Sequence, residues 1–82
     1  MSQKTFNLTI SRVDEPVFAG EAISVTVPGV AGEMVILAEH EPLISPLKAG
    51  TVHYTDAEGI EQTVETTGGT LEVAHNHATV LL

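Results

Sequence analysis

The sequence predicts an all-β fold, a small two-sheet β-sandwich of about eight to ten short strands. Along most of the chain, apolar and polar residues alternate, as they do in strands that bury one face and expose the other. Turn-forming residues interrupt these runs roughly every eight to twelve residues, a spacing typical of sandwiches and barrels. No segment of helical length carries apolar side chains at the three- to four-residue spacing of an amphipathic helix.

The N-terminal part of the chain is expected to contain two strands. Residues 6–11 alternate between apolar and polar side chains, so one face of this strand should be buried. Glu15-Pro16 follows, and because proline removes a backbone donor, it is expected to end the strand. Val17-Phe18 is then predicted to form a separate short strand.

Two central segments differ in their pattern. Residues 22–27 alternate, and the side chains expected to face the core are Ile23, Val25 and Val27. Residues 34–37, after the glycine-containing loop, are four successive apolar residues. A strand without alternation is typical of one that is covered on both faces, so these four residues are predicted to be buried on both sides.

The second half of the chain repeats the alternation, in runs at residues 51–55, 60–65, 70–73 and 78–82. Glu41-Pro42 and Ser45-Pro46 are expected to interrupt the apolar stretch that precedes these runs. Residues 56–59, Asp-Ala-Glu-Gly, predict a hairpin loop, and Gly68-Gly69 predicts a bend or bulge. His75-Asn76-His77 predicts a tight connection, because its asparagine can adopt a positive φ.

Length and charge limit the possible functions. The chain has 82 residues, 11 of them acidic and three basic, with a formal net charge of −8. One domain spanning residues 1–82 is expected. The charge argues against nucleic acid, where affinity comes from lysine and arginine on phosphates, and against docking on anionic lipid. A specific partner should present a basic or apolar surface, although acidic residues can also serve only to keep a domain soluble.

Features that the sequence lacks indicate the compartment in which the protein is expected. The chain has no cysteine, which rules out disulfides and thiolate ligands and fits a reducing compartment. Residues 1–4 lack the features of a secretory signal, and no apolar run approaches the roughly 20 residues that span a bilayer. We therefore expect a soluble protein that is not secreted and does not insert into lipid, although it can be peripheral on a larger membrane assembly.

The histidines are the main candidates for chemistry. His75 and His77 have the spacing of a metal pair on a strand, but they flank a predicted turn, and exposed turn residues are the alternative. His53 is expected to be a solvated strand residue. His40 lies in an irregular stretch between apolar segments, where a polar side chain usually makes a hydrogen bond or a contact.

Catalytic motifs are missing from the sequence. There is no cysteine nucleophile and no Gly-x-Ser-x-Gly elbow, and residues 29–32 lack the Gly-Lys-Ser/Thr ending of a phosphate-binding loop. We therefore predict no catalytic residues, no cofactor, no bound metal and no small-molecule substrate.

Three motifs occur in order along the chain. Residues 29–43 read Gly-x-x-Gly-Glu-Met-x-Ile-Leu-x-x-His-x-Pro-Leu, residues 68–73 read Gly-Gly-x-Leu-Glu-Val, and residues 8–20 form the opening segment. All three resemble segments of the epsilon subunit of F-type ATP synthases, a family that commonly has Gly-Glu-Leu-Gly-Ile-x-Pro-Gly-His-x-Pro-Leu at the first motif. The resemblance covers nearly the whole chain. It departs at Val35, where the family usually has Gly, and at Ala38-Glu39, where it usually has Pro-Gly.

The resemblance implies a non-catalytic β-sandwich domain of the central stalk, whose partners are the gamma subunit and the c-ring. It implies that Glu33 lies against the c-ring loops, unless it is an ordinary exposed loop acid, and that His40 lies near the contact with gamma. Leu43 is expected to complete the partner contact or to belong to the core. It also implies a peripheral location on the cytoplasmic face of a bacterial inner membrane. The family's C-terminal helical hairpin would begin where this sequence stops, at Leu82, so the chain is expected to lack the inhibitory activity of that hairpin.

Two alternatives remain open at this point. The first is a generic interaction or carbohydrate-binding β-sandwich, which would normally need exposed aromatic side chains. Only Phe6, Phe18 and Tyr54 are available, and both phenylalanines are expected to be buried. The second is a small metal enzyme of the double-sheet barrel class that uses His40, His75 and His77.

Overall fold

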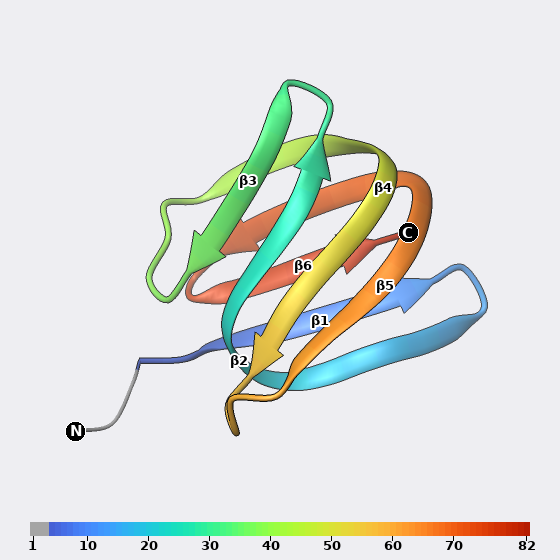
Figure 1. Cartoon of the computed structure of the whole chain (residues 1–82). Coiled ribbons are helices and arrows are strands. Elements are labelled where there is room, and N and C mark those ends of the chain that lie inside the picture. The colour runs from blue at the N-terminus through green and yellow to red at the C-terminus, as the bar shows by residue number, and fades with distance from the viewer. Residues whose placement is uncertain (1–3) are drawn as a thin grey trace.

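The structure is a computed structural model that describes residues 4–82 (Figure 1). Its strands, in chain order, are β1 (Phe6–Arg12), β2 (Glu15–Gly29), β3 (Gly32–Leu37), β4 (Leu43–Asp56), β5 (Glu61–Ala74) and β6 (His77–Leu81). These residues form no helix, and hence none with the length and apolar character needed to cross a membrane. The all-β prediction is confirmed. Residues 1–3, on which the argument against a secretory signal partly rests, lie outside the described range.

All six strands belong to one sheet, in the order β1-β6-β5-β4-β2-β3. An additional antiparallel pairing of β1 with β2 closes five of these strands into a barrel-like body, and β3 lies outside it against β2. Every pairing is antiparallel except that of β1 with β6. The long strands curve from one layer of the flattened body into the other (Figure 1). The sandwich is therefore one folded sheet, and the prediction of two separate sheets is corrected.

The prediction of eight to ten strands is also wrong, because expected breaks lie inside long strands. Glu15-Pro16 opens β2 instead of ending β1, and Ser45-Pro46 lies within β4. Gly68-Gly69 does form the expected bend, with φ of 140° and 154°, but the bend lies inside β5. Next to it the Thr66 hydroxyl donates to the Gly68 carbonyl oxygen at 2.6 Å. A strand that bends can continue pairing, so turn signals overestimated the number of strands.

The core fills the space between the two layers of this sheet. Its buried apolar side chains are Phe6, Leu8, Ile10, Ala22, Val25, Val27, Ile36, Leu47, Val52, Tyr54, Leu71, Val73, Ala78 and Val80. Alternation along residues 6–10 is confirmed. In β2, however, Ala22 is buried where Ile23 was expected, because the pairing of β2 with β4 shifts register between Ala22 and Ser24. An extra residue at such a bulge changes the face on which the following side chains lie.

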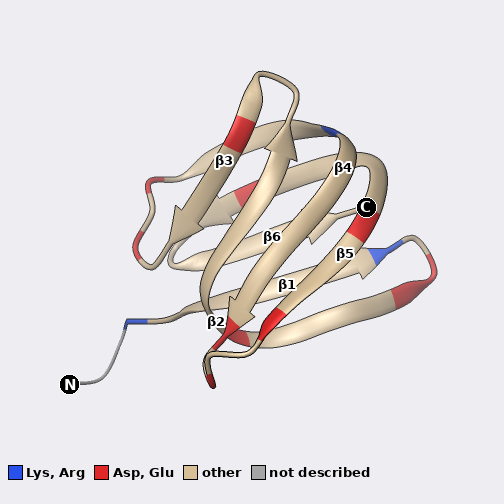
Figure 2. Ribbon diagram, in the orientation of Figure 1, with Lys and Arg blue, Asp and Glu red and all other residues tan. Residues whose placement is uncertain are grey.

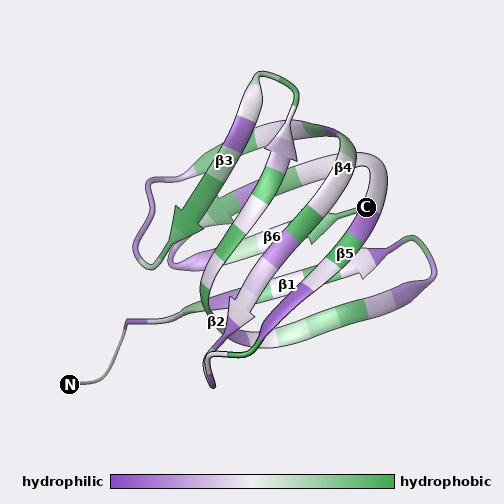
Figure 3. Cartoon of the chain, in the orientation of Figure 1, coloured by the Kyte–Doolittle hydropathy of each residue, from purple (hydrophilic) through white to green (hydrophobic). Residues whose placement is uncertain are grey.

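β3 does not have the double burial expected of four successive apolar residues. Ile36 is 1% exposed, but Val35 and Leu37 are 53% and 54% exposed. Figure 3 shows this apolar half of β3 at the edge of the sheet. Side chains on alternate faces meet different environments, and no second layer within residues 4–82 covers the outer face of β3. The prediction is wrong for these two residues.

Both predicted hairpin connections are confirmed. In the β4–β5 turn, Asp56 Oδ1 accepts hydrogen bonds from the backbone N–H groups of Glu58 at 2.9 Å and Ile60 at 3.0 Å. In the β5–β6 turn, His75 and Asn76 have φ of 50° and 56°. Two successive positive φ values define the type I′ turn, whose twist matches that of the strands it joins.

Candidate protein-binding site

Glu33 lies in β3 next to the β2–β3 turn. It is exposed, and it stands opposite Pro28 of β2 in the antiparallel register. It is the only acidic residue of β3, and Figure 2 shows the red position on that strand. An exposed carboxylate on a paired strand is held in place by its backbone and can accept hydrogen bonds from a partner.

His40 lies in the loop of residues 38–42, which joins β3 to β4. It is half-buried, and its backbone N–H donates to the Leu37 carbonyl oxygen at 3.3 Å. Its Nδ1 lies 2.7 Å from the carbonyl oxygen of Glu41. Because a carbonyl oxygen can only accept, Nδ1 donates this hydrogen bond, and Nε2 is the second hydrogen-bonding atom of the ring.

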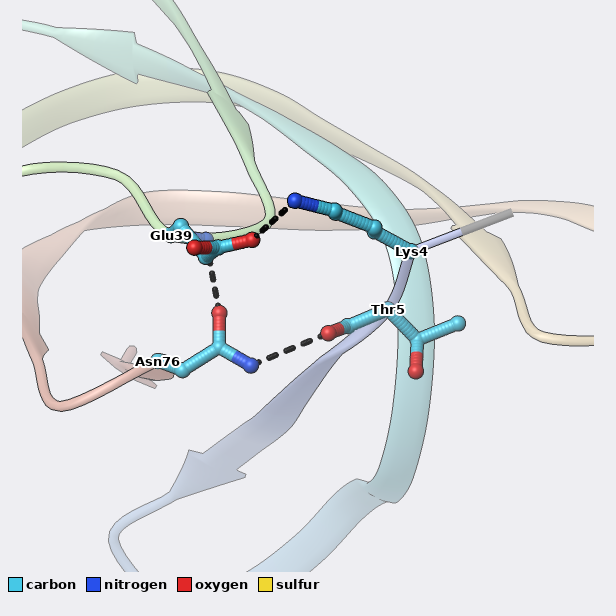
Figure 4. A network of polar contacts seen from close by, with 4 residues as sticks. All are labelled: Lys4, Thr5, Glu39 and Asn76. Carbon is cyan, nitrogen blue, oxygen red and sulfur yellow. Dashed lines mark hydrogen bonds and ion pairs between the residues drawn. The ribbon is translucent and has the colours of Figure 1, made fainter. Parts of the chain in front are cut away.

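Polar contacts tie this loop to two distant segments (Figure 4). The backbone N–H of Glu39 donates to Asn76 Oδ1 at 2.6 Å, and Asn76 Nδ2 donates to the Thr5 carbonyl oxygen at 3.0 Å. Lys4 Nζ donates to Glu39 Oε2 at 2.7 Å. This hydrogen bond, together with the lysine charge, holds the pKa of the Glu39 carboxyl below its usual value.

Glu39 has an unusual backbone conformation. Its φ is 63°, in the left-handed region that residues other than glycine seldom adopt. The resembled family usually has Pro-Gly at Ala38-Glu39, so Glu39 stands where that family has the glycine. The loop keeps a path that suits glycine and places a glutamate there, and the contacts with Lys4 and Asn76 stabilise that conformation.

Leu43 begins β4, beside the loop. It is half-buried and packs against the core, so it serves both as core and as surface. It helps to line a depression of about 400 Å³, and the other residues that line this depression are Pro42, Ile44, Glu72, Val73 and Ala74. Ile44 is 72% exposed, which makes the depression's rim apolar. Sequence analysis missed Ile44, although alternation counted backwards from buried Leu47 places it on the outer face.

The predicted residues fall into two groups. His40 and Leu43 lie at the end of β3 where the chain enters β4, whereas Glu33 lies at the opposite end of this strand. The four residue steps from Glu33 to Leu37 alone span roughly 13 Å. The structure therefore offers two separate surfaces on one rigid sheet, and it does not bring the three residues into one site.

The other histidines do not form a common site. His53 is exposed on β4 and His75 is exposed in the β5–β6 turn, as expected. His77 Nε2 lies 3.2 Å from the Thr9 hydroxyl. Within residues 4–82, no three histidine or acidic side chains lie close enough together to hold a metal ion. The metal-enzyme alternative with His40, His75 and His77 therefore finds no support in the geometry.

The aromatic residues do not favour a sugar-binding surface either. Phe6 and Tyr54 are buried. Phe18 is half-buried, less than expected, and its ring centroid lies 4.7 Å from that of Tyr54. The rings are used for packing within the domain, and sugar stacking would need an exposed ring face.

Comparison with known proteins agrees with this geometry. Residues 5–82 match the family model for the β-sandwich domain of the ATP synthase delta/epsilon chain. Relatives named ATP synthase epsilon chain include one from Bordetella petrii, 46% identical over 77 residues, which cover 94% of this chain and 55% of the relative. One from Latilactobacillus sakei is 38% identical over 81 residues, which cover 96% and 56% of the two chains. The chain thus spans about half the length of these relatives.

Solved structures share the fold. A chain in the mitochondrial ATP synthase of Euglena gracilis (OSCP/F1/c-ring, rotational state 1) superposes with a TM-score of 0.89 at 23% identity, covering 99% of this chain and 52% of that one. A chain in the central stalk/c-ring of the Tetrahymena thermophila enzyme gives 0.78 at 15% identity, covering 99% and 65%. From the family match and the epsilon-chain relatives together, this chain belongs to the β-sandwich domain family of the ATP synthase delta/epsilon chain.

Proposed function

We propose that this domain is a non-catalytic part of the central stalk of an F-type ATP synthase, where it links the gamma subunit to the c-ring. The observation that carries the proposal is the placement of Glu33 and of His40 with Leu43 at opposite ends of β3, in a chain of this family. A linker that transmits torque needs two contact surfaces on a body that does not deform. The closed sheet and its packed core supply such a body.

Glu33 is the proposed contact with the c-ring. Its exposed carboxylate is suited to a charge-assisted hydrogen bond with an arginine of the c-ring loops, and such bonds are short and directional. The net charge of −8 favours a basic partner surface in general. Both structural neighbours come from ATP synthase assemblies that include a c-ring, which supports this partner class.

His40 and Leu43 are the proposed contact with gamma. The apolar rim around Leu43 can bury surface against a partner, and His40 presents Nε2 as a hydrogen-bonding atom beside it. The domain would then be peripheral to the membrane, on the cytoplasmic side in a bacterium. It would need no cofactor and would bind no nucleotide, so a calorimetric titration with ATP should give no saturable signal. Saturable binding in the micromolar range would contradict this part of the proposal.

The test of the proposal uses Glu33→Lys, with Glu58→Lys as the matched control. Glu58 lies in the exposed β4–β5 turn, at the other end of the molecule from the β2–β3 turn (Figure 1), and its substitution makes the same change of charge. Co-purification with the c-ring and the melting temperature are measured for both variants. We expect Glu33→Lys to weaken assembly more than it lowers the melting temperature, and Glu58→Lys to change neither. Equal effects of the two variants on assembly would overturn the role of Glu33.

A further inference from the structure

Asn76 connects three segments that are distant in the sequence. Its Oδ1 accepts the Glu39 N–H at 2.6 Å, its Nδ2 donates to the Thr5 carbonyl oxygen at 3.0 Å, and its own carbonyl oxygen accepts the Asn7 N–H at 3.0 Å. Figure 4 shows the side-chain amide between the loop of residues 38–42 and the segment that leads into β1. One side chain in the β5–β6 turn thus holds the loop that carries His40.

The bond to Glu39 is placed where the loop changes direction. Glu39 has a positive φ and directly precedes His40. Fixing the Glu39 N–H fixes the Ala38–Glu39 peptide plane, and the bond from the His40 N–H to the Leu37 carbonyl oxygen fixes the next plane, from which the histidine projects. Lys4 also holds Glu39 through an ion pair, but the two side chains are largely exposed, at 77% and 63%. Exposed pairs contribute little and are screened by salt. The amide of Asn76 is therefore the main anchor of Glu39 outside the loop.

We propose that Asn76 is a positioning residue for partner binding. Its side chain holds residues 38–42 in the conformation that presents His40, together with Leu43, to the gamma subunit. This inference rests on the proposed function, because it assigns a role to Asn76 through the surface that His40 and Leu43 form. Asn76 itself need not touch the partner.

The chemistry of the turn explains why asparagine is suited to this task. The second residue of a type I′ turn needs a positive φ, which asparagine and glycine adopt with little strain. The Asn76 amide also offers, on two separate atoms, the acceptor that Glu39 requires and the donor that Thr5 requires. Asn76→Gly therefore removes the side-chain bonds and keeps the turn. Asn76→Asp keeps the acceptor for Glu39 but replaces the donor to Thr5 with a carboxylate oxygen, which repels the Thr5 carbonyl oxygen.

The experiment measures the affinity of this chain for its gamma subunit, well below the melting temperature, for Asn76→Gly, Asn76→Asp and His40→Ala. We expect Asn76→Gly to weaken binding about 3- to 10-fold, the equivalent of one hydrogen bond. Asn76→Asp should recover part of this loss, because it keeps the bond to Glu39. Amide hydrogen exchange at residues 39–41 should accelerate in Asn76→Gly and accelerate less in Asn76→Asp.

A double-mutant cycle separates positioning from general stability. If Asn76 acts through the histidine, Asn76→Gly should weaken binding little further when His40 is already alanine. Unchanged affinity of Asn76→Gly beside weakened His40→Ala overturns the positioning role, as do fully additive losses. Unchanged affinity of both variants, with the original chain binding gamma in the same assay, overturns the proposed gamma contact itself.

Discussion

Gly69 approaches the backbone of Leu81 so closely that a β-carbon at this position would overlap the Leu81 carbonyl oxygen. The two residues meet where β5 bends beside the end of β6. The absence of a side chain therefore permits both the bend, with its φ of 154°, and the close pairing of the two strands.

Replacing Gly69 with alanine should destabilise the domain strongly. The positive φ and the overlap with Leu81 both oppose a β-carbon, so we expect a loss of roughly 2–5 kcal/mol in the free energy of unfolding. Gly59→Ala is the control, since Gly59 also has a positive φ, 84°, but has open space around its Cα. Its loss should be near 1 kcal/mol. Urea denaturation measures both, and equal losses would show that the contact with Leu81 is unimportant.

The two faces of β3 should respond differently to truncation. Ile36→Ala opens a cavity in the core and should cost about 2–5 kcal/mol of unfolding free energy. Leu37→Ala, one residue further on, removes a half-exposed side chain and should cost about 1 kcal/mol or less. Similar losses measured by chemical denaturation would mean that the outer face of β3 is covered in solution.

These strands show what the sequence could and could not predict. Alternation located the core residues of β1, because burial of one strand face is a local pattern. Alternation and turn signals missed three features: the bulge at Ile23, the uncovered face of β3 and the continuation of β4 through Pro46. Each of these depends on which strands become neighbours, and the closing pairs join residues far apart, such as Asn7 with His77. Local turn signals carry no information about such pairs.

Tyr54 should make stability depend on alkaline pH. Burial, and secondarily the charge of Asp56, raises the pKa of its phenol above 10.0. The unfolded chain then ionises first as the pH rises. The contribution of Tyr54 is thus complete below its unfolded pKa near 10 and is lost as the pH approaches the raised value in the folded state. Unfolding free energies from about pH 8 to about pH 11 should fall less steeply in Tyr54→Phe than in the original chain. Parallel curves would contradict this prediction.

Glu39 allows a test of backbone strain against side-chain contacts. Glu39→Gly relieves the positive φ of 63° but loses the pair with Lys4, whereas Glu39→Ala loses the pair and keeps the strain. We expect the glycine variant to be at least as stable as the original chain, and the alanine variant to be the least stable of the three. Thermal unfolding ranks them, and an alanine variant that matches the glycine variant would show that the loop carries no strain at this residue.

The site was only partly predictable for a related reason. The family motif marked Glu33, His40 and Leu43, which lie within one stretch of the sequence. Asn76 was recognised only as a turn residue, because its bond to Glu39 joins positions 37 residues apart. A motif records the residues that are present in a segment, and it does not show which distant side chain holds that segment in place.

The parallel pairing of β1 with β6 has a consequence for how this protein is made. Residues 7–11 lie beside residues 77–81, so a growing polypeptide that has emerged only as far as β5 cannot yet form that ladder. Until β6 leaves the ribosome, β1 has only β2 as a neighbour, and the apolar side chains of both strands face an unfinished interior. Contacts this distant in sequence form late, so the exposed strands of a partly synthesised chain are open to aggregation until β6 is available.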